Sequence, residues 1–260
     1  SETVRSLAAR VHTVLPSANL MDGAAKQFDD GLYAAVDLAC YRGELGFCPA
    51  LPEMIQAVFG KLPAKSPARP FLAAALELAG RKATLTAEED AFKRELLRGF
   101  EEDKVRSKPI GFYGWTPELA QLWRFMRFLQ REFEQRELKP CLDVAAVLEG
   151  NPGLATQYRA VNGLFGRLTN PLICLPTDAL IGKGTDLKAL AAEKGARRVT
   201  VAIFPPSTSR ETELFYRLFG GGVPPGVNLM NELIRRIRSG QVRLELVSAH
   251  LLVSSFGLVN

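Results

Sequence analysis

The chain has 260 residues, of which 47% are hydrophobic and 23% are charged; these ordinary values for a globular protein exclude a disordered or fibrous chain. This length allows one large domain or two small ones, each with its own core. The formal net charge of +5 is mildly basic and falls far short of the dense basic surface of a dedicated nucleic-acid-binding protein. No apolar run approaches the roughly 20 residues of a membrane-spanning helix, so we expect no membrane span.

The first hundred residues predict a series of helices. Apolar residues at helical spacing, together with proline and glycine stop signals, indicate helices over residues 3–15, Ala24–Tyr41, Pro52–Leu62 and Pro70–Gly80. Thr86 and Glu89 have the spacing of a capping box, which predicts the start of a further helix that runs towards Glu102.

The stretch Gly111–Glu137 carries the strongest pattern of the chain and both tryptophans. Thr116 followed by Pro117 marks the start of a helix, since threonine can cap it and proline suits its first turn. Apolar residues then follow at steps of three and four, on one side of this helix: Leu119, Leu122, Met126, Leu129 and Phe133. Further aromatic residues widen the apolar sector, so we expect a central helix that packs against several neighbours.

Three arginines form a stripe on the remaining face of this helix: Arg124, Arg127 and Arg131. Arginines beside aromatic side chains can hold nucleic acid or another phosphate ligand. The alternative, which we favour because glutamates are interleaved with them, is a solvated face whose arginines pair with these glutamates. The entry segment GFYGW is where we would first search for a ligand, because aromatic residues flanked by glycine are readily exposed: Phe112, Tyr113 and Trp115.

The chain changes character after a short helical segment, DVAAVLE, that lies between Pro140 and Gly153. The Gly-Asn-Pro-Gly sequence after it is the best candidate boundary between a helical part, residues 1–140, and a part with strands, residues 154–260. The two parts can also form one continuous domain. A helix over Leu154–Leu168 precedes two expected short strands, LICLP and VTVAIF, which enclose a helix near Thr185–Lys194. The fold class is therefore mainly α, a helical core with a few short strands in the C-terminal part, and α+β is the second choice.

The last sixty residues predict two helices and a strand. Thr208 and Glu211 form a second capping box for a helix to about Phe219, and Asn228 caps a later helix. Apolar residues alternate with charged ones over residues 242–246, as in a strand with one solvated face. The densest positive surface lies here: Arg235, Arg236, Arg238 and Arg243. It could contact phosphates, acidic lipid head groups or an acidic protein, although a plain solvated surface is the better interpretation.

Residues that carry chemistry are sparse. The four cysteines, Cys40, Cys48, Cys141 and Cys174, form no Cys-x-x-Cys pair. A disulfide between the first two is plausible if the GELGF segment turns back, and buried free thiols are at least as good an alternative. With only two histidines and no closely spaced ligand pair, we expect no metal site, and we assign no catalytic residue, cofactor-binding residue or cofactor.

Four segments between Lys108 and Leu233 carry a further pattern through their order: KPIGFYGWTPELAQLWRFMRFL, YRAVNGLFGRLTNPLICLPTDALIGKGTDLKAL, VAIFPPSTSRETELFYRLF and VPPGVNLMNEL. Together they resemble a bacterial family known only as a domain of unknown function, typical of large secreted, mainly helical lipoproteins. The chain departs from that family in its shorter length and in Phe112, where the family tends to show histidine. The resemblance implies a periplasmic or secreted location and no activity. A start at Ser1 without methionine suits a processed secreted protein or a recombinant chain whose leader was removed.

These observations favour a non-enzymatic binding or interaction protein of a bacterial extracytoplasmic compartment. Its partner is expected to be a protein or a small anionic ligand, held in a groove beside the central helix or on the C-terminal basic surface. Two alternatives stay open. One is a hydrolase-like enzyme that uses carboxylates or His250 in an unrecognised arrangement, and the other binds anions or nucleic acid through the C-terminal arginines. The sequence does not indicate an oligomeric state.

Overall fold

A computed structural model describes residues 17–168, 172–183, 185–207, 219, 227–241, 243–246 and 256–259. The described part is mainly α, as predicted, with short strands only in its C-terminal part. The predicted helix over residues 3–15 lies outside the described residues, and so do His250 and all of the predicted 208–219 helix except Phe219. Within the described ranges, every helix is too short or too polar to cross a membrane.

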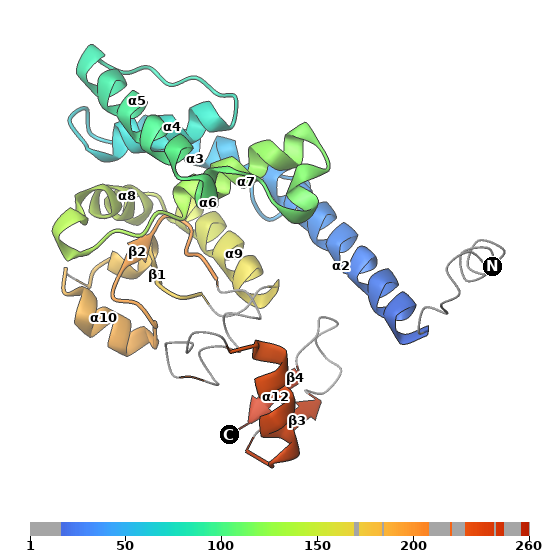
Figure 1. The fold of residues 1–260 in the computed structure, drawn as a ribbon. Helices are drawn as coiled ribbons and strands as arrows, with labels where there is room; N and C mark the ends of the chain where they lie inside the picture. Colours follow the sequence, from blue (N-terminus) through green and yellow to red (C-terminus); the bar gives the residue numbers. More distant parts are fainter. Residues whose placement is uncertain are drawn as a thin grey trace.

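The helices of the first half are α2 (Ser17–Arg42), α3 (Leu51–Lys61), α4 (Ala68–Leu78), α5 (Ala87–Glu102), α6 (Lys104–Ser107), the 3-10 helix η1 (Gly111–Gly114) and α7 (Pro117–Leu129). The second half contains η2 (Gln135–Glu137), α8 (Lys139–Glu149), α9 (Pro152–Leu168), β1 (Leu175–Pro176), η3 (Thr177–Leu180), α10 (Leu187–Lys194), β2 (Val201–Ala202), α12 (Leu229–Arg238), β3 (Arg243–Leu246) and β4 (Phe256–Val259). In Figure 1, α2 is a long rod whose N-terminal end points away from the other helices.

Helix α7 is central, as its apolar sector predicted. It contacts α2, α4, α6 and η1. Its start follows the predicted chemistry, since the Thr116 hydroxyl accepts a hydrogen bond from the Leu119 N–H at 3.2 Å and Pro117 opens the first turn. Phe125 and Leu129 on this helix are completely buried.

The predicted seam of α7 was wrong at Phe133, because the helix ends at Leu129. Phe133 instead pairs with Val201: its N–H donates to the Val201 carbonyl at 2.7 Å, and the Val201 N–H donates back at 3.1 Å. Phe133 is buried all the same, with its ring 5.2 Å from that of Phe71. Helical spacing identified a core residue correctly but could not reveal that a distant strand takes up its backbone groups.

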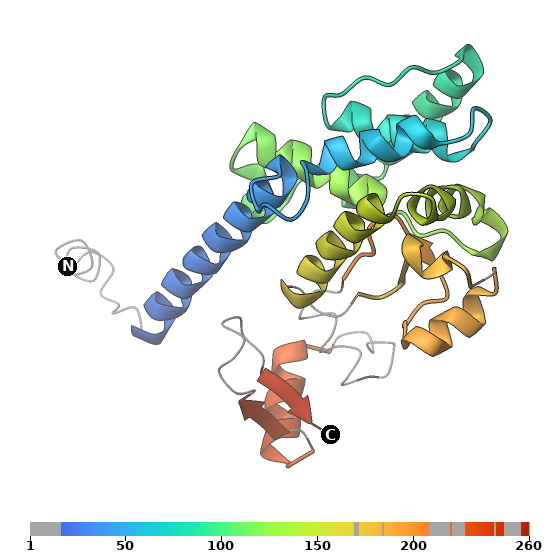
Figure 2. The same ribbon diagram turned by 180° about the vertical axis from the view of Figure 1, so that it is seen from behind.

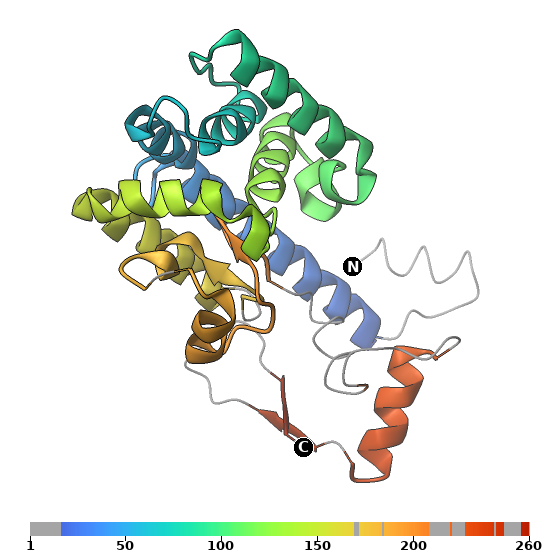
Figure 3. The same cartoon turned by 90° about the vertical axis from the view of Figure 1, so that its left-hand side faces the viewer.

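One contiguous set of buried residues runs from Cys40 to Phe204. Helix α8 joins its upper and lower halves, since it contacts α3 and α4 on one side and η3 and α9 on the other. The view from behind shows α3, α4 and α5 above α8, with α10 and the strands below (Figure 2). The side view also places α8 between these two layers (Figure 3). Both predicted parts of the chain therefore contribute to the same core, and their division into separate domains stays a prediction.

The strands are present where the sequence predicted them, but they are much shorter than expected. LICLP provides β1 and VTVAIF provides β2, which pair in parallel with Leu175 opposite Val201. The predicted helix between them is α10, capped by the Asp186 carboxylate, and it supplies the crossover that a parallel pair needs. In the C-terminal part, β3 pairs antiparallel with β4, a strand that the sequence did not predict.

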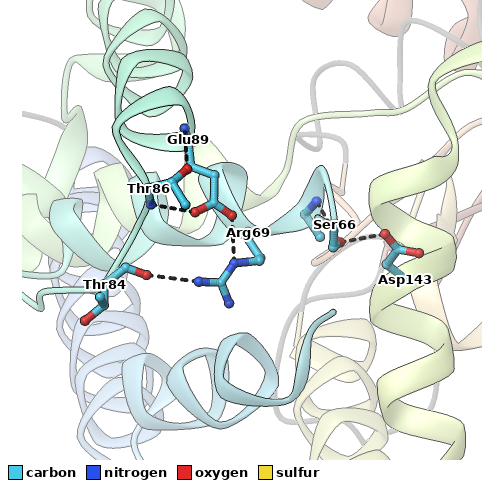
Figure 4. A network of polar contacts seen from close by, with 7 residues as sticks. Ser66, Arg69, Thr84, Thr86, Glu89 and Asp143 are labelled. Carbon is cyan, nitrogen blue, oxygen red and sulfur yellow. Dashed lines mark hydrogen bonds and ion pairs between the residues drawn. The ribbon is translucent and has the colours of Figure 1, made fainter. Parts of the chain in front are cut away.

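A network of polar contacts ties the starts of α4 and α5 together and reaches α8 (Figure 4). The Thr86 hydroxyl accepts from the Glu89 N–H at 3.2 Å, and the Glu89 carboxylate accepts from the Thr86 N–H at 2.8 Å, which confirms the predicted capping box. Arg69 of α4 donates to the same carboxylate at 2.8 Å. Ser66 donates to the buried Asp143 carboxylate of α8 at 2.5 Å. Glu89 thus caps one helix and anchors its neighbour.

We expect Thr86→Ala to lower the free energy of unfolding by about 1 kcal/mol, because it leaves the Glu89 N–H without its cap. Urea denaturation of the full chain measures this change. Thr84→Ala is the matched control: Thr84 is exposed, and its backbone carbonyl, which the substitution keeps, accepts from Arg69. An equal loss in both variants would show that the cap contributes nothing to stability.

Candidate anion-binding site

A hollow of about 140 Å³ lies against one side of α7. Its lining combines aromatic, aliphatic and polar side chains: Tyr113, Leu122, Trp123, Met126, Arg127, Gln130 and Ser207. A cavity of about 150 Å³ suffices to hold benzene. The hollow therefore has room for one small molecule beside the central helix, next to the GFYGW segment that the sequence singled out.

Arg127 is the charged group of this hollow. Its Nη1 donates to the Gln130 side-chain oxygen at 3.0 Å, and its guanidinium carbon lies 5.4 Å from the centre of the Trp123 ring. Its Nε is buried and has no hydrogen-bond partner among the described residues. No described carboxylate forms an ion pair with it, and burial lowers its pKa. Arg127 thus carries a charge without an ion pair, and the only described carboxylate that acts on it through its charge is Asp103.

Arg106 of α6 places a second guanidinium close by. Its Nη2 donates to the Arg127 backbone carbonyl at 3.0 Å. Burial lowers the pKa of Arg106, and so does the positive charge of Arg127, while Asp103 opposes both effects at longer range. Two half-buried cations that repel each other create a positive potential at this end of α7.

Aromatic rings build the wall between η1 and α7. The ring centres of Tyr113 and Trp123 lie 4.8 Å apart, and those of Phe112 and Tyr113 lie 4.2 Å apart. The Trp123 indole N–H donates to the Arg106 carbonyl at 3.1 Å, which fixes the ring. Trp115, by contrast, is 56% exposed. Of the three aromatic residues predicted in the entry segment, Tyr113 alone lines the hollow, Phe112 packs behind it, and Trp115 faces solvent.

Asp37 of α2 holds Tyr113 in place. The Tyr113 hydroxyl donates to its carboxylate at 2.6 Å. Burial raises the pKa of Asp37 to about 6, although this hydrogen bond opposes the rise. Burial and the neighbouring Asp37 charge also raise the pKa of Tyr113. At neutral pH the carboxylate is therefore mostly ionised, and the tyrosine stays protonated and donates to it.

The three arginines of the predicted stripe do not meet in one site. Arg124 forms an ion pair with Glu101 of α5 and lines a different, broader hollow. Arg131 lies 3.8 Å from a Glu137 oxygen and covers the Phe133 ring at 5.1 Å. Arg131 thus pairs with an interleaved glutamate, as the favoured alternative expected, whereas the partner of Arg124 comes from another helix. Arg127 differs from both, because it forms no ion pair with the described residues.

The C-terminal arginines are partly neutralised. Arg235 and Arg236 both donate to the Glu232 carboxylate, at distances from 2.6 to 2.8 Å, and these hydrogen bonds lower the pKa of Glu232 to about 2. Arg238 is exposed at the end of α12, and Arg243 lies on β3. Two of the four predicted cations thus share one carboxylate.

Sequence reasoning missed Asp37, Arg106, Gln130 and Ser207. Asp37 left a signal, since it is an acid inside the apolar run AAVDLAC, where an ionised group needs a partner. Arg106 left none, because it sits in the charged segment EEDKVRSK, which is typical of an exposed turn.

The four cysteines are buried free thiols, the alternative that the sequence left open beside a disulfide. Within the described part of the chain, no three His, Cys, Asp or Glu side chains gather where they could hold a metal ion. Comparisons of the chain with protein-family models, with curated proteins and with solved structures each find no match, so the family resemblance stays a prediction.

Proposed function

We propose that this chain is a non-enzymatic binding protein whose hollow beside α7 holds one small organic anion. The observation that carries the proposal is Arg127, a guanidinium that lines the hollow and forms no ion pair with the described residues. A half-buried cation without an ion pair is costly, and a bound anion would offset that cost. An extracytoplasmic location, expected from the family resemblance, would suit such a role.

Among possible anions, the size and lining of the hollow favour a small carboxylate. Its volume of about 140 Å³ suits an acid built on a short chain or a single ring. Guanidinium and carboxylate form charge-assisted hydrogen bonds, while Gln130 and Ser207 can complete the polar contacts. Trp123, Tyr113 and Leu122 offer an apolar surface for the remainder of the molecule.

Arg127 distinguishes this hollow from the second one. The broader hollow is lined by Arg124, whose Nε is also unpartnered, but the Arg124 guanidinium already forms an ion pair with Glu101. An anion there would have to compete with an existing carboxylate. At the C-terminal arginines an anion would compete with Glu232 in the same way, which makes these arginines weaker candidates. A hydrolase-like reaction through His250 stays a prediction, because His250 lies outside the described residues.

Arg127→Gln should weaken benzoate binding by roughly tenfold or more, because it removes the charged partner of the carboxylate from the lining of the hollow. Trp123 reports binding directly, since it lines the hollow and is one of only two tryptophans. The titration therefore uses Trp115→Phe as the parent chain and follows Trp123 fluorescence. Benzamide, the neutral counterpart of benzoate, is the ligand control.

Arg98→Gln is the matched protein control, because Arg98 is an exposed arginine of α5 with only a loose partner, Glu102, at 3.8 Å. It removes the same charge and should leave the affinity unchanged. Acetate, butyrate and phosphate complete the panel of anions. Equal benzoate binding by both arginine variants would contradict the proposed site, and the absence of a fluorescence change with every anion would overturn the proposed function.

A further inference from the structure

Two thiols meet where α2 ends and the chain turns towards α3. Cys40 lies in the last turn of α2 with 0% exposure, and Cys48 precedes α3 with 6% exposure. Both belong to the same cluster of buried residues, and each thiol affects the pKa of the other. The charge of Cys174 likewise affects the pKa of Cys141, but the side-chain hydrogen bonds that affect the pKa of these two thiols come from Thr177 and Thr200 and not from a second cysteine.

The backbone between the two cysteines holds them together. Gly43 adopts φ +76°, a left-handed conformation that suits glycine, and its N–H donates to the Cys40 carbonyl at 3.2 Å. The Glu44 N–H donates to the Ala39 carbonyl at 2.8 Å, which closes the end of the helix. Gly43 also lies directly against Ala50, because a Cβ at this position would come within 2.5 Å of the Ala50 nitrogen. The GELGF segment thus turns back, which is the condition that a link between Cys40 and Cys48 requires.

We propose that Cys40 and Cys48 are a site of disulfide formation, by thiol–disulfide exchange with a small-molecule disulfide such as oxidised glutathione. Cys48, the more exposed of the two, attacks as a thiolate and forms a mixed disulfide with release of one glutathione thiol. The Cys40 thiolate then displaces the second glutathione. The protein loses two hydrogen atoms and two electrons, and the oxidant is reduced to two thiols.

The disulfide would link the end of α2 to the segment before α3, close to a residue that shapes the hollow. Asp37, which holds Tyr113 beside the hollow, lies one turn before Cys40 on α2. Burial raises the pKa of both thiols, so exchange is slow in the folded chain and fastest while the chain folds. Closing the loop restricts the unfolded chain, so the oxidised protein should melt about 5 °C higher than the reduced one.

Peptide mapping after equilibration in glutathione buffers tests the proposal on the full chain. Samples are quenched with acid, denatured, alkylated and digested with trypsin. Arg42 lies between the two cysteines, so the digest separates Gln27–Arg42 from Gly43–Lys61 unless a disulfide joins them. We expect this cross-linked pair in oxidising buffer and its loss after reduction, while Cys141 and Cys174 are alkylated in both.

Two variants make the result decisive. Cys141→Ser with Cys174→Ser keeps only the pair, and after oxidation it should be lighter by two hydrogen atoms and show no free thiol. Cys48→Ser should leave its three remaining thiols open to alkylation. Two free thiols in the oxidised double variant, or a persistent glutathione adduct on Cys48, would overturn the proposal. If the double variant does not fold, peptide mapping of the unsubstituted chain decides between the same outcomes.

Discussion

Replacing Tyr158 with phenylalanine is expected to cost about 2 to 4 kcal/mol of unfolding free energy. Tyr158 of α9 is fully buried, with its ring stacked 5.8 Å from that of Phe204. Its hydroxyl donates to the Ile203 carbonyl and accepts from the Thr177 N–H, the latter at 3.1 Å. The substitution keeps the ring and removes only these two contacts, so two buried backbone groups each lose a partner.

The position of this hydroxyl explains the size of the effect. Ile203 directly follows β2, and Thr177 directly follows β1. Both strands are only two residues long, and the tyrosine hydroxyl bridges their backbones just beyond the paired residues. Burial also raises the pKa of Tyr158, so the hydroxyl stays protonated and able to donate.

Urea denaturation of the two proteins measures the cost. Tyr41→Phe is the matched control, because Tyr41 is also a core residue, yet its hydroxyl makes no hydrogen bond with the described residues. That variant should lie within about 0.5 kcal/mol of the parent chain. If Tyr158→Phe were equally mild, water or rearranged backbone would be replacing the hydroxyl, and the buried bridge would carry no stability.

Asp37→Asn should stabilise the protein at neutral and alkaline pH, by about 2 kcal/mol. The pKa of Asp37 rises from 3.8 to about 6 on folding, chiefly because burial disfavours its charge. The full conversion of that rise is about 3 kcal/mol, and solvent around the half-buried side chain reduces it. Asparagine carries no charge and can still accept the hydrogen bond from Tyr113.

The gain should depend on pH in a defined direction. Between about pH 4 and pH 6 the folded state holds a proton on Asp37 that the unfolded chain has lost, so this group favours folding most at low pH. Its contribution falls as pH rises towards 6 and stays low above it. The stability difference between Asp37→Asn and the parent chain should therefore be small near pH 4 and should reach its plateau above about pH 7.

Thermal denaturation from pH 4 to pH 8 measures this difference as a rise of roughly 4 to 8 °C at the alkaline end. Asp22→Asn provides the control, since Asp22 is an exposed acid on the same helix and should change the melting temperature little at any pH. A pH-independent difference for Asp37→Asn would mean that its carboxylate is not held in a desolvated environment. Keeping an ionised Asp37 at such a cost is consistent with a role in ordering Tyr113 for ligand binding.

The start of each well-marked element could be predicted from sequence, because caps depend on neighbouring residues. Thr116 and Pro117 open α7, and Thr86 with Glu89 opens α5, as their spacing indicated. The end of α7 could not be predicted. No glycine or proline stops it, and Phe133 leaves the helix to pair with Val201, which the local pattern of the helix cannot reveal.

The candidate site was predictable only in part, for a similar reason. Tyr113 and Arg127 were singled out because aromatic residues and arginines cluster in one stretch. Which arginine remains without an ion pair depends on carboxylates from other elements: Glu101 forms an ion pair with Arg124, whereas Arg127 forms none with the described residues. Charge patterning along one helix cannot show these contacts.

By itself the sequence determined a mainly helical fold, the central place of α7 and the short strands around α10, because periodicity and capping are local properties of the chain. Only the tertiary structure decided where these elements leave a hollow and which charges meet there. Asp37 and Tyr113 are far apart in the chain, as are Arg124 and Glu101, so their partnership arises from the packing of α2, η1, α5 and α7. That packing leaves Arg127 beside the hollow without an ion pair to the described residues.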